Sequence, residues 1–148
     1  MQKIYLAGSC SSNKRTFMKK IAEELRKRKY IVYCPFELKI ENAWDMSQEE
    51  WSNRVFSHDV AAINNCDIFL MISDGRNSTA GTNFEQGYAY AKRKHIIVVQ
   101  YTENETSLMT YCGCDFFINT DEDKICKEII HAIERPHLTK GSCKTYLT

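Results

Sequence analysis

Short apolar segments alternate along the chain with longer segments in which apolar residues recur every three or four positions. The short, β-rich segments are Lys3–Ala7, Tyr30–Cys34, Asp67–Ile72, His95–Gln100 and Phe116–Ile118. Helical spacing occurs at Phe17, Ile21 and Leu25, at Trp51, Val55, Ala62 and Ile63, at Phe84, Tyr88 and Ala91, and at Ile125, Ile129 and Ile133. Strands that are apolar on both faces and separated by helices indicate a parallel sheet covered on both sides.

We therefore expect an α/β fold with a five-stranded parallel doubly wound sheet, flavodoxin- or Rossmann-like, flanked by helices on both faces. Pro136 ends the last helix. A single domain over residues 1–136 and a C-terminal tail over residues 137–148 follow from this boundary. The tail carries Leu138 and Tyr146, which could dock on the domain.

Ligands of open parallel sheets bind outside the carboxyl ends of the strands, near the point where strand order reverses. The loops expected there are Gly8–Asn13, Pro35–Met46, Ser73–Gly81 and Tyr101–Leu108, all rich in hydroxyl, amide or glycine residues. The first loop lacks the G-x-G-x-x-G fingerprint of a dinucleotide site. It is either a capped turn or a small anion site at a helix N-terminus.

Composition narrows the class of protein. Among 148 residues, 20 Lys+Arg and 19 Asp+Glu give a net charge of +1, which argues against a dedicated nucleic-acid binder. The longest apolar run, Ile68–Ile72, is too short to span a bilayer, and no secretory signal opens the chain, so a soluble cytoplasmic protein is expected. The chain has seven cysteines, which is an odd number, and none of them form a Cys-x-x-Cys pair. We expect reduced thiols, no metal and no cofactor.

The loop after the third strand leads into a helix that carries Glu85. Thr82-x-x-Glu85 has the spacing of a capping box, in which Glu85 only completes the helix N-terminus. A functional carboxylate is the alternative, because the dipole holds an acid in the first turn ionised, as a nucleophile requires. Gly87 also favours it, since glycine inside a helix costs about 1 kcal/mol relative to alanine unless close packing requires it. The local pattern leaves both interpretations open.

Several motifs resemble the nucleoside 2-deoxyribosyltransferase family, in the same order along the chain. They are Tyr5-Leu6-Ala7-Gly8 in the first strand, Trp51, Asp59 with Asp67 eight residues later, Gly81-Thr82-x-x-Glu85-x-Gly87-Tyr88-Ala89, and Leu108-Met109. The resemblance covers roughly residues 3–118.

The resemblance implies an enzyme that cleaves an N-glycosidic bond through an oxocarbenium-like transition state. Glu85 would attack C1′ and form a glycosyl-enzyme intermediate, as in retaining glycosidases. Tyr5 would orient Glu85, and Asp59 would assist proton transfer to the departing base or hold sugar and base in register. Trp51 would line the base and sugar pocket. Met109 would reach into a neighbouring subunit's site, which implies a homodimer or higher homo-oligomer.

Two branches of the family differ at the phosphate end. Transferases acting on free nucleosides typically have an aspartate six residues before the nucleophile, where this chain has Thr79. The nucleoside 5′-monophosphate N-hydrolases have hydroxyl residues there and at two further places, occupied here by Ser9 and Ser107. Hydroxyls donate hydrogen bonds to a phosphate dianion, whereas an aspartate repels it. Gly8 and Gly81 complete the implied phosphate-binding set.

The sequence thus favours hydrolysis of (2′-deoxy)nucleoside 5′-monophosphates to free base and sugar phosphate, with nearby Lys14 or Arg15 adding attraction. The alternatives are base exchange on free 2′-deoxynucleosides and a non-catalytic nucleotide-binding module. The position of Asp59 presents a geometric problem. If the helix runs unbroken from Ser47, Asp59 lies about 18 Å along it from the end that is expected near the ligand-binding edge. A helix break near residues 52–57, or a tilt, would bring it to the ligand-binding edge.

Overall fold

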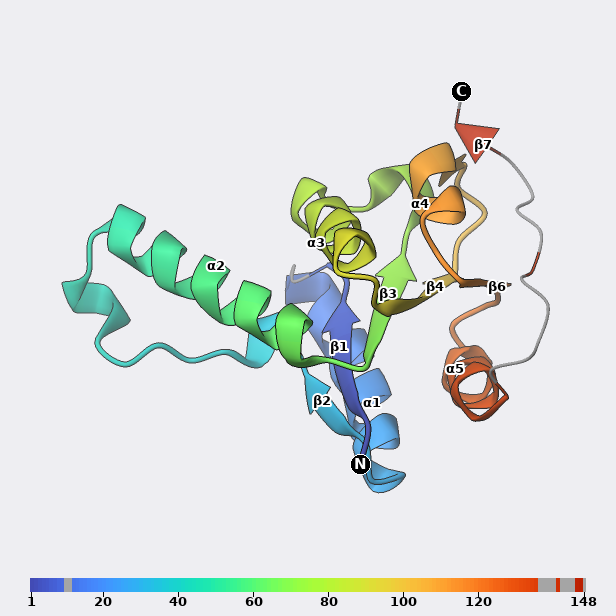
Figure 1. Ribbon diagram of the computed structural model, residues 1–148, viewed down its shortest axis with the longest axis horizontal. Coiled ribbons are helices and arrows are strands. Elements are labelled where there is room, and N and C mark those ends of the chain that lie inside the picture. The colour runs from blue at the N-terminus through green and yellow to red at the C-terminus, as the bar shows by residue number, and fades with distance from the viewer. Residues whose placement is uncertain (10–11, 136–140, 142–145, 148) are drawn as a thin grey trace.

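The computed structural model describes residues 1–9, 12–135, 141 and 146–147, and its strands and helices alternate as the apolar pattern predicts (Figure 1). The strands are β1 (Lys3–Ala7), β2 (Ile31–Tyr33), β3 (Ile68–Ser73), β4 (His95–Gln100), β5 (Thr106–Ser107), β6 (Phe116–Asn119) and β7 (Tyr146–Leu147). The α-helices are α1 (Ser12–Lys27), α2 (Gln48–Asn65), α3 (Ala80–Ala91), α4 (Leu108–Cys112) and α5 (Ile125–Glu134).

Five of these strands form one sheet in the order β2-β1-β3-β4-β6, and every neighbouring pair is parallel. This confirms the predicted doubly wound α/β fold. Strand order reverses between β1 and β3, so the ligand-binding crevice is expected where these two strands end. The short parallel pair of β5 and β7 forms a second sheet that the pattern did not predict, because two residues carry no periodicity.

Side chains alternate between the two faces of the sheet and build a separate core on each. Ile4 and Leu6 of β1 pack in the core that includes residues of α1 and α5. Tyr5 and Ala7 point the other way, into a core completed by Ile63 of α2 and by residues of α3. Both faces are therefore covered, as expected for parallel strands without a polar side.

Helix α2 explains how Asp59 reaches the ligand-binding edge. The helix runs without interruption from Gln48 to Asn65, which excludes the first of the two alternatives, a break near residues 52–57. Residues 34–47 carry the chain away from the sheet, and α2 returns across the strand direction (Figure 1). The helix is thus tilted, and its start, capped by the Ser47 hydroxyl as predicted, is remote from the sheet. Within the described residues, no helix is long and apolar enough to cross a membrane.

Part of the expected C-terminal tail lies against the domain. The Tyr111 hydroxyl donates to the carbonyl oxygen of Gly141 at 3.1 Å, and the Gly141 amide donates to the Phe117 carbonyl at 3.1 Å. Strand β7 pairs with β5. Residues 136–140, 142–145 and 148, including Leu138, lie outside the described residues, and the division of the chain at residue 136 stays a prediction.

Candidate active site

A cleft of about 470 Å³ opens at the carboxyl edge of β1 and β2, between these strands and helices α2 and α3. It is lined by Gly8, Ser9, Arg15, Pro35, Phe36, Leu38, Ile40, Trp51, Val55, Asp59, Thr79, Gly81, Thr82 and Glu85. The lining combines an apolar wall, two carboxylates, three hydroxyls and one guanidinium. Most of the residues that the sequence singled out therefore meet in one place.

Glu85 is held from below by Tyr5. The Tyr5 hydroxyl, on a fully buried side chain of β1, donates a hydrogen bond to Oε2 of Glu85 on α3. Burial and the nearby Glu85 charge raise the pKa of Tyr5, so the phenol stays protonated and remains a donor. The carboxylate is thereby fixed at the floor of the cleft.

The position of Glu85 on its helix differs from the expectation. Thr79, not Thr82, is the N-cap of α3, because the Thr79 hydroxyl accepts a hydrogen bond from the amide of Thr82. Glu85 therefore lies in the second turn and completes no capping box, and the predicted first-turn carboxylate is wrong. The dipole weakens beyond the first turn. Burial, aided by the Asp59 charge, instead raises the pKa of Glu85 to about 7, against the lowering effect of the Tyr5 hydrogen bond.

Asp59 faces the same cleft from α2. Trp51, Val55 and Asp59 follow one another at intervals of four residues, which places them along one helix face. All three line the cleft. Burial raises the pKa of Asp59, while a hydrogen bond from Tyr33 lowers it. Asp59 and Glu85 line the same cleft, and the Asp59 charge adds to the effect of burial on the pKa of Glu85.

The hydroxyl and glycine residues expected at the phosphate end lie along the same cleft. Gly8 and Ser9 come from the end of β1, and Thr79 and Gly81 from the start of α3. A side chain at Gly8 would meet the Met18 Cε at 2.6 Å, so glycine lets α1 pack closely there. At Gly81 a Cβ would meet nothing within 4 Å, so the space beside Glu85 is open.

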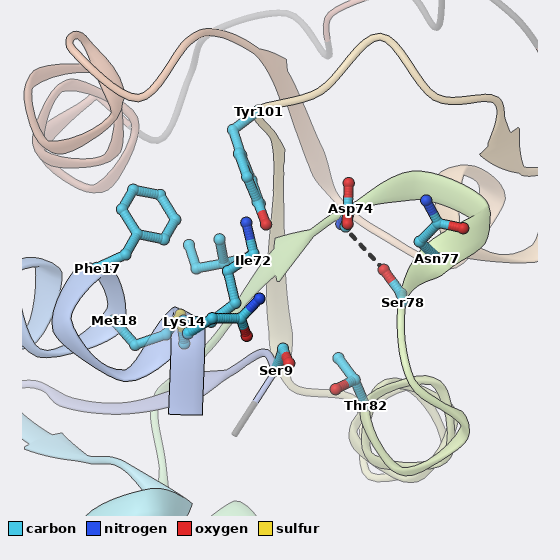
Figure 2. Close-up of a pocket in the computed structure, with 11 residues that line it drawn as sticks. Ser9, Lys14, Phe17, Met18, Ile72, Asp74, Asn77, Ser78, Thr82 and Tyr101 are labelled. Carbon is cyan, nitrogen blue, oxygen red and sulfur yellow. Dashed lines mark hydrogen bonds between the residues drawn. The ribbon is translucent and has the colours of Figure 1, made fainter. Parts of the chain in front are cut away.

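A smaller cavity of about 210 Å³ adjoins the cleft and shares Ser9 and Thr82 with it. Figure 2 shows Lys14 extending from α1 toward Tyr101, with Ser9 and Thr82 on the side of the cavity away from Tyr101. The Lys14 ammonium lies 5.1 Å from the centroid of the Tyr101 ring, and a hydrogen bond with the Tyr101 hydroxyl raises the pKa of Lys14. Asp74 at the end of β3 also lines the cavity, which therefore presents charges of both signs.

Two predicted site residues lie elsewhere. Ser107 and Met109 line a separate hollow with Asn83, Gly87 and Tyr90, on a different face of α3 from Glu85. The Met109 side chain is 80% exposed. A Cβ at Gly87 would meet nothing within 4 Å among the described residues, whose packing therefore does not account for that glycine. The structure thus does not bring Ser107 and Met109 to the Glu85 of their own chain.

The sequence did not identify Tyr33, whose hydroxyl donates to Asp59, or three apolar loop residues that line the cleft. The sequence pattern assigned Tyr33 only to a strand. Tyr33 is the third residue of β2 and Tyr5 is the third residue of β1, so the two tyrosines hold equivalent positions in their strands. Phe36, Leu38 and Ile40 alternate in the loop after β2. An alternating apolar run in a loop at the ligand-binding edge was the available signal. No group of three or more potential metal ligands occurs among the residues that the structure describes.

A doubly wound sheet with a cleft at the carboxyl ends of its strands, floored by a buried tyrosine–carboxylate pair, is the architecture of a ligand-binding α/β enzyme. The sequence model described as nucleoside 2-deoxyribosyltransferase matches residues 4–138. The chain belongs to the nucleoside 2-deoxyribosyltransferase family, and it is an enzyme of the N-glycosidase and glycosyltransferase class that acts on nucleosides or nucleotides.

Solved structures agree with this assignment. A 2-deoxyribosyltransferase from Bacillus psychrosaccharolyticus is 26% identical, with 83% of this chain and 89% of that chain covered and a TM-score of 0.69. Two structures share the fold at lower identity. The Clostridium botulinum CMP N-glycosidase BcmB is 19% identical (88% and 98% covered, TM-score 0.64). A conserved protein from Enterococcus faecalis V583 is 18% identical (88% and 98% covered, TM-score 0.62). No curated protein sequence matches this chain.

Proposed function

We propose that this protein hydrolyses the N-glycosidic bond of (2′-deoxy)nucleoside 5′-monophosphates and releases free base and sugar phosphate. The observation that carries the proposal is the pair of carboxylates in one cleft, with Glu85 fixed by the Tyr5 hydroxyl. A fixed, ionised carboxylate on one side of an anomeric carbon and a second acid near the leaving group are the groups that retaining glycoside cleavage requires.

The reaction proceeds in two steps. In the first, a Glu85 oxygen forms a bond to C1′ while the bond from C1′ to the base nitrogen breaks, and the protonated Asp59 gives its proton to the departing base. In the second, water attacks C1′ and displaces the Glu85 oxygen, and Asp59 accepts the proton from that water. Glu85 returns to its carboxylate form, so atoms and charge balance over the cycle. Burial raises the pKa of Asp59, which favours the protonated form that the first step uses.

A 5′-phosphate fits the polar end of the cleft. Ser9, Thr79 and Thr82 offer hydroxyls there, and the Arg15 guanidinium lines the same cleft. Lys14 lies in the adjoining cavity and adds positive charge. A carboxylate at position 79 would repel a phosphate dianion, but this chain has the hydroxyl of Thr79 there. The fold shared with a CMP N-glycosidase lends support to a nucleotide substrate.

The opposite end of the cleft suits the base. Phe36, Leu38, Ile40 and Trp51 give it an apolar wall with one large aromatic ring. Planar bases bind well against aromatic and aliphatic surfaces, since the desolvated faces pack without unpaired polar groups. Asp59 lies on the same wall, one helical turn beyond Val55 and within the lining.

Base exchange between free 2′-deoxynucleosides is the second candidate. It is favoured by the 26% identity to a 2-deoxyribosyltransferase over most of both chains. In that case an acceptor base, not water, takes the sugar from Glu85. A non-catalytic nucleotide-binding module is the third candidate, and it requires ligand affinity without turnover.

We propose further that a second copy of the chain completes the site. Ser107 and Met109 lie away from their own Glu85, and the open space beside Gly87 adjoins them. Ser107 of one subunit would then donate to the phosphate bound by the other, and Met109 would pack against that subunit's base or sugar.

A base-release screen tests the proposal. Nucleosides and their 5′-monophosphates are incubated with the protein, with and without an added acceptor base, and free base is separated by chromatography. Hydrolysis predicts release from monophosphates without any acceptor. Reaction of unphosphorylated nucleosides alone, and only with an acceptor, would establish the transferase instead.

A further inference from the structure

Three aromatic rings lie side by side on the face of the sheet that α2 and α3 cover. Tyr33, Tyr5 and Phe69 are register partners on β2, β1 and β3. The Tyr5 centroid lies 5.4 Å from that of Tyr33 and 5.4 Å from that of Phe69, with interplanar angles of 23° and 9°. Register partners on parallel strands project from the same face. The two phenol hydroxyls therefore emerge next to one another beneath the helices.

Each of these hydroxyls donates to a carboxylate on a different helix. Tyr5 donates to Glu85 of α3, and Tyr33 donates to Oδ1 of Asp59 on α2 at 2.8 Å. The two carboxylates of the cleft are thus held by two neighbouring, stacked rings of the sheet. The mechanism proposed above uses the first pair and gives Tyr33 no role.

We propose that Tyr33 is the positioning residue of Asp59: its hydroxyl holds Oδ1 and leaves Oδ2 to exchange the proton with the leaving base. The proposal rests on the function proposed for Asp59. Asp59 is only half-buried on its helix face, so without a partner its carboxylate could rotate about the side-chain bonds, and a proton donor must keep hydrogen-bonding reach of its acceptor. The stacked ring of Tyr33 is itself immobilised by Tyr5, so the hydroxyl is a fixed anchor.

The hydrogen bond also affects proton affinity. The titratable or charged groups around Asp59 are Tyr33 on β2, Tyr5 on β1, Glu85 on α3, His58 on α2 and Arg15 of α1 in the same cleft. Burial raises the pKa of Asp59, and the Tyr33 hydrogen bond opposes it by stabilising the carboxylate. Burial and the Asp59 hydrogen bond raise the pKa of Tyr33, which stays a donor. Loss of the hydroxyl therefore moves the pKa of Asp59 upward.

The first experiment measures this pKa without any substrate. The Asp59 carboxyl carbon is titrated by ¹³C NMR in the parent, in Tyr33→Phe and in Tyr88→Phe. Tyr33→Phe retains the stacked ring and removes only the hydroxyl. Tyr88→Phe is the matched control, since the Tyr88 hydroxyl donates to Asn64 Oδ1 of α2 at 2.9 Å but lies outside the cleft. We expect a higher Asp59 pKa in Tyr33→Phe alone; an unchanged value overturns the proposal.

The second experiment is a kinetic cycle of Tyr33→Phe, Asp59→Asn and the double variant. We expect Tyr33→Phe to lower kcat roughly ten-fold, a part of the 10²–10⁴-fold that a positioned acid contributes, with KM changed less than about two-fold. In the Asp59→Asn background the same change should have no further effect. Equal losses in both backgrounds mean that Tyr33 acts independently of Asp59 and contradict the proposal.

The two experiments separate this proposal from the proposed function. If Asp59→Asn retains full base release, the role of Asp59 in proton transfer fails, and with it the catalytic part of the inference. The NMR titration still reports whether Tyr33 controls the carboxylate. A raised Asp59 pKa together with full activity of Asp59→Asn therefore locates the error in the proposed function.

Discussion

Asp59 of α2 and Glu85 of α3 line the same cleft, where burial raises the pKa of Glu85 and the Asp59 charge adds to that effect. The pKa of Glu85 is raised to about 7 as a result. A nucleophile with this pKa is only partly ionised at neutral pH, so the proposed chemistry predicts a characteristic pH dependence.

We expect kcat/KM for base release to fall on the acid side of about pH 7, because only ionised Glu85 attacks C1′, and on the alkaline side, because Asp59 must be protonated to give its proton to the base. Tyr5→Phe removes the hydrogen bond that lowers the Glu85 pKa, so the acid limb of the profile should move to higher pH. Initial rates between pH 4 and 9 measure both effects. An acid limb near the ordinary glutamate value would contradict the role of Glu85.

Substitution of the nucleophile provides the direct chemical test. Glu85→Gln keeps the shape of the side chain and an acceptor for the Tyr5 hydroxyl, but it cannot form the ester to C1′. We expect base release to fall roughly a thousand-fold or more, as when one member of a catalytic unit is removed. Glu105→Gln, which breaks only an exposed 3.2 Å ion pair with Arg76, is the control and should retain full activity.

Glu85→Gln should be more stable than the parent protein at alkaline pH. In the folded parent, Glu85 keeps its proton up to a pKa of about 7, whereas in the unfolded chain it loses the proton near the ordinary glutamate pKa of 4.5. The free energy of unfolding of the parent therefore declines as pH rises from about 4.5 to about 7. Glu85→Gln has no such decline. We expect its free energy of unfolding to exceed that of the parent by roughly 1–3 kcal/mol at pH 8. The difference should vanish at pH 4 in urea unfolding measured at both pH values.

Gly87→Ala tests whether a second copy covers α3. A Cβ at this position has open space in the chain, so alanine should stabilise the isolated helix by about 1 kcal/mol. If a second subunit packs there, the added methyl group should weaken assembly, which sedimentation at several concentrations measures. Gly81→Ala is the matched control, because it also has open space but faces the cleft. Unchanged assembly in Gly87→Ala would remove this surface from the proposed interface.

Ser107→Ala tests the origin of the phosphate ligands. A hydrogen bond to a charged group contributes about 1.5–3 kcal/mol, so kcat/KM for 5′-monophosphates should fall roughly ten- to hundred-fold while nucleosides are little affected. Mixing Ser107→Ala with inactive Glu85→Gln should restore activity, since one site of the mixed assembly then contains both native residues. Equal losses for nucleosides and nucleotides would assign Ser107 a contact with the sugar.

Local sequence patterns determined the elements of this fold. The apolar runs specified β1 and β4 to the residue and the other three sheet strands within one residue of their ends, because buried parallel strands require continuous apolar segments. The family motif identified Glu85, Tyr5 and Asp59, which the structure brings together. The helix start was not determined locally: Thr82 alone has a glutamate three residues later, as a capping box requires, yet the observed backbone selects Thr79 as the N-cap.

Interactions between distant segments were decided by the tertiary structure. Tyr5 and Glu85 are 80 residues apart, and Tyr33 and Asp59 are 26 apart, so no local spacing records either hydrogen bond. The raised pKa of Glu85 arises from burial and a neighbouring charge, which exist only after α2 and α3 pack on the sheet. The sequence by itself identified the candidate residues for chemistry, since side-chain type and periodicity are local properties. The tertiary structure decided which of them meet and in what protonation state, because both depend on the three-dimensional environment.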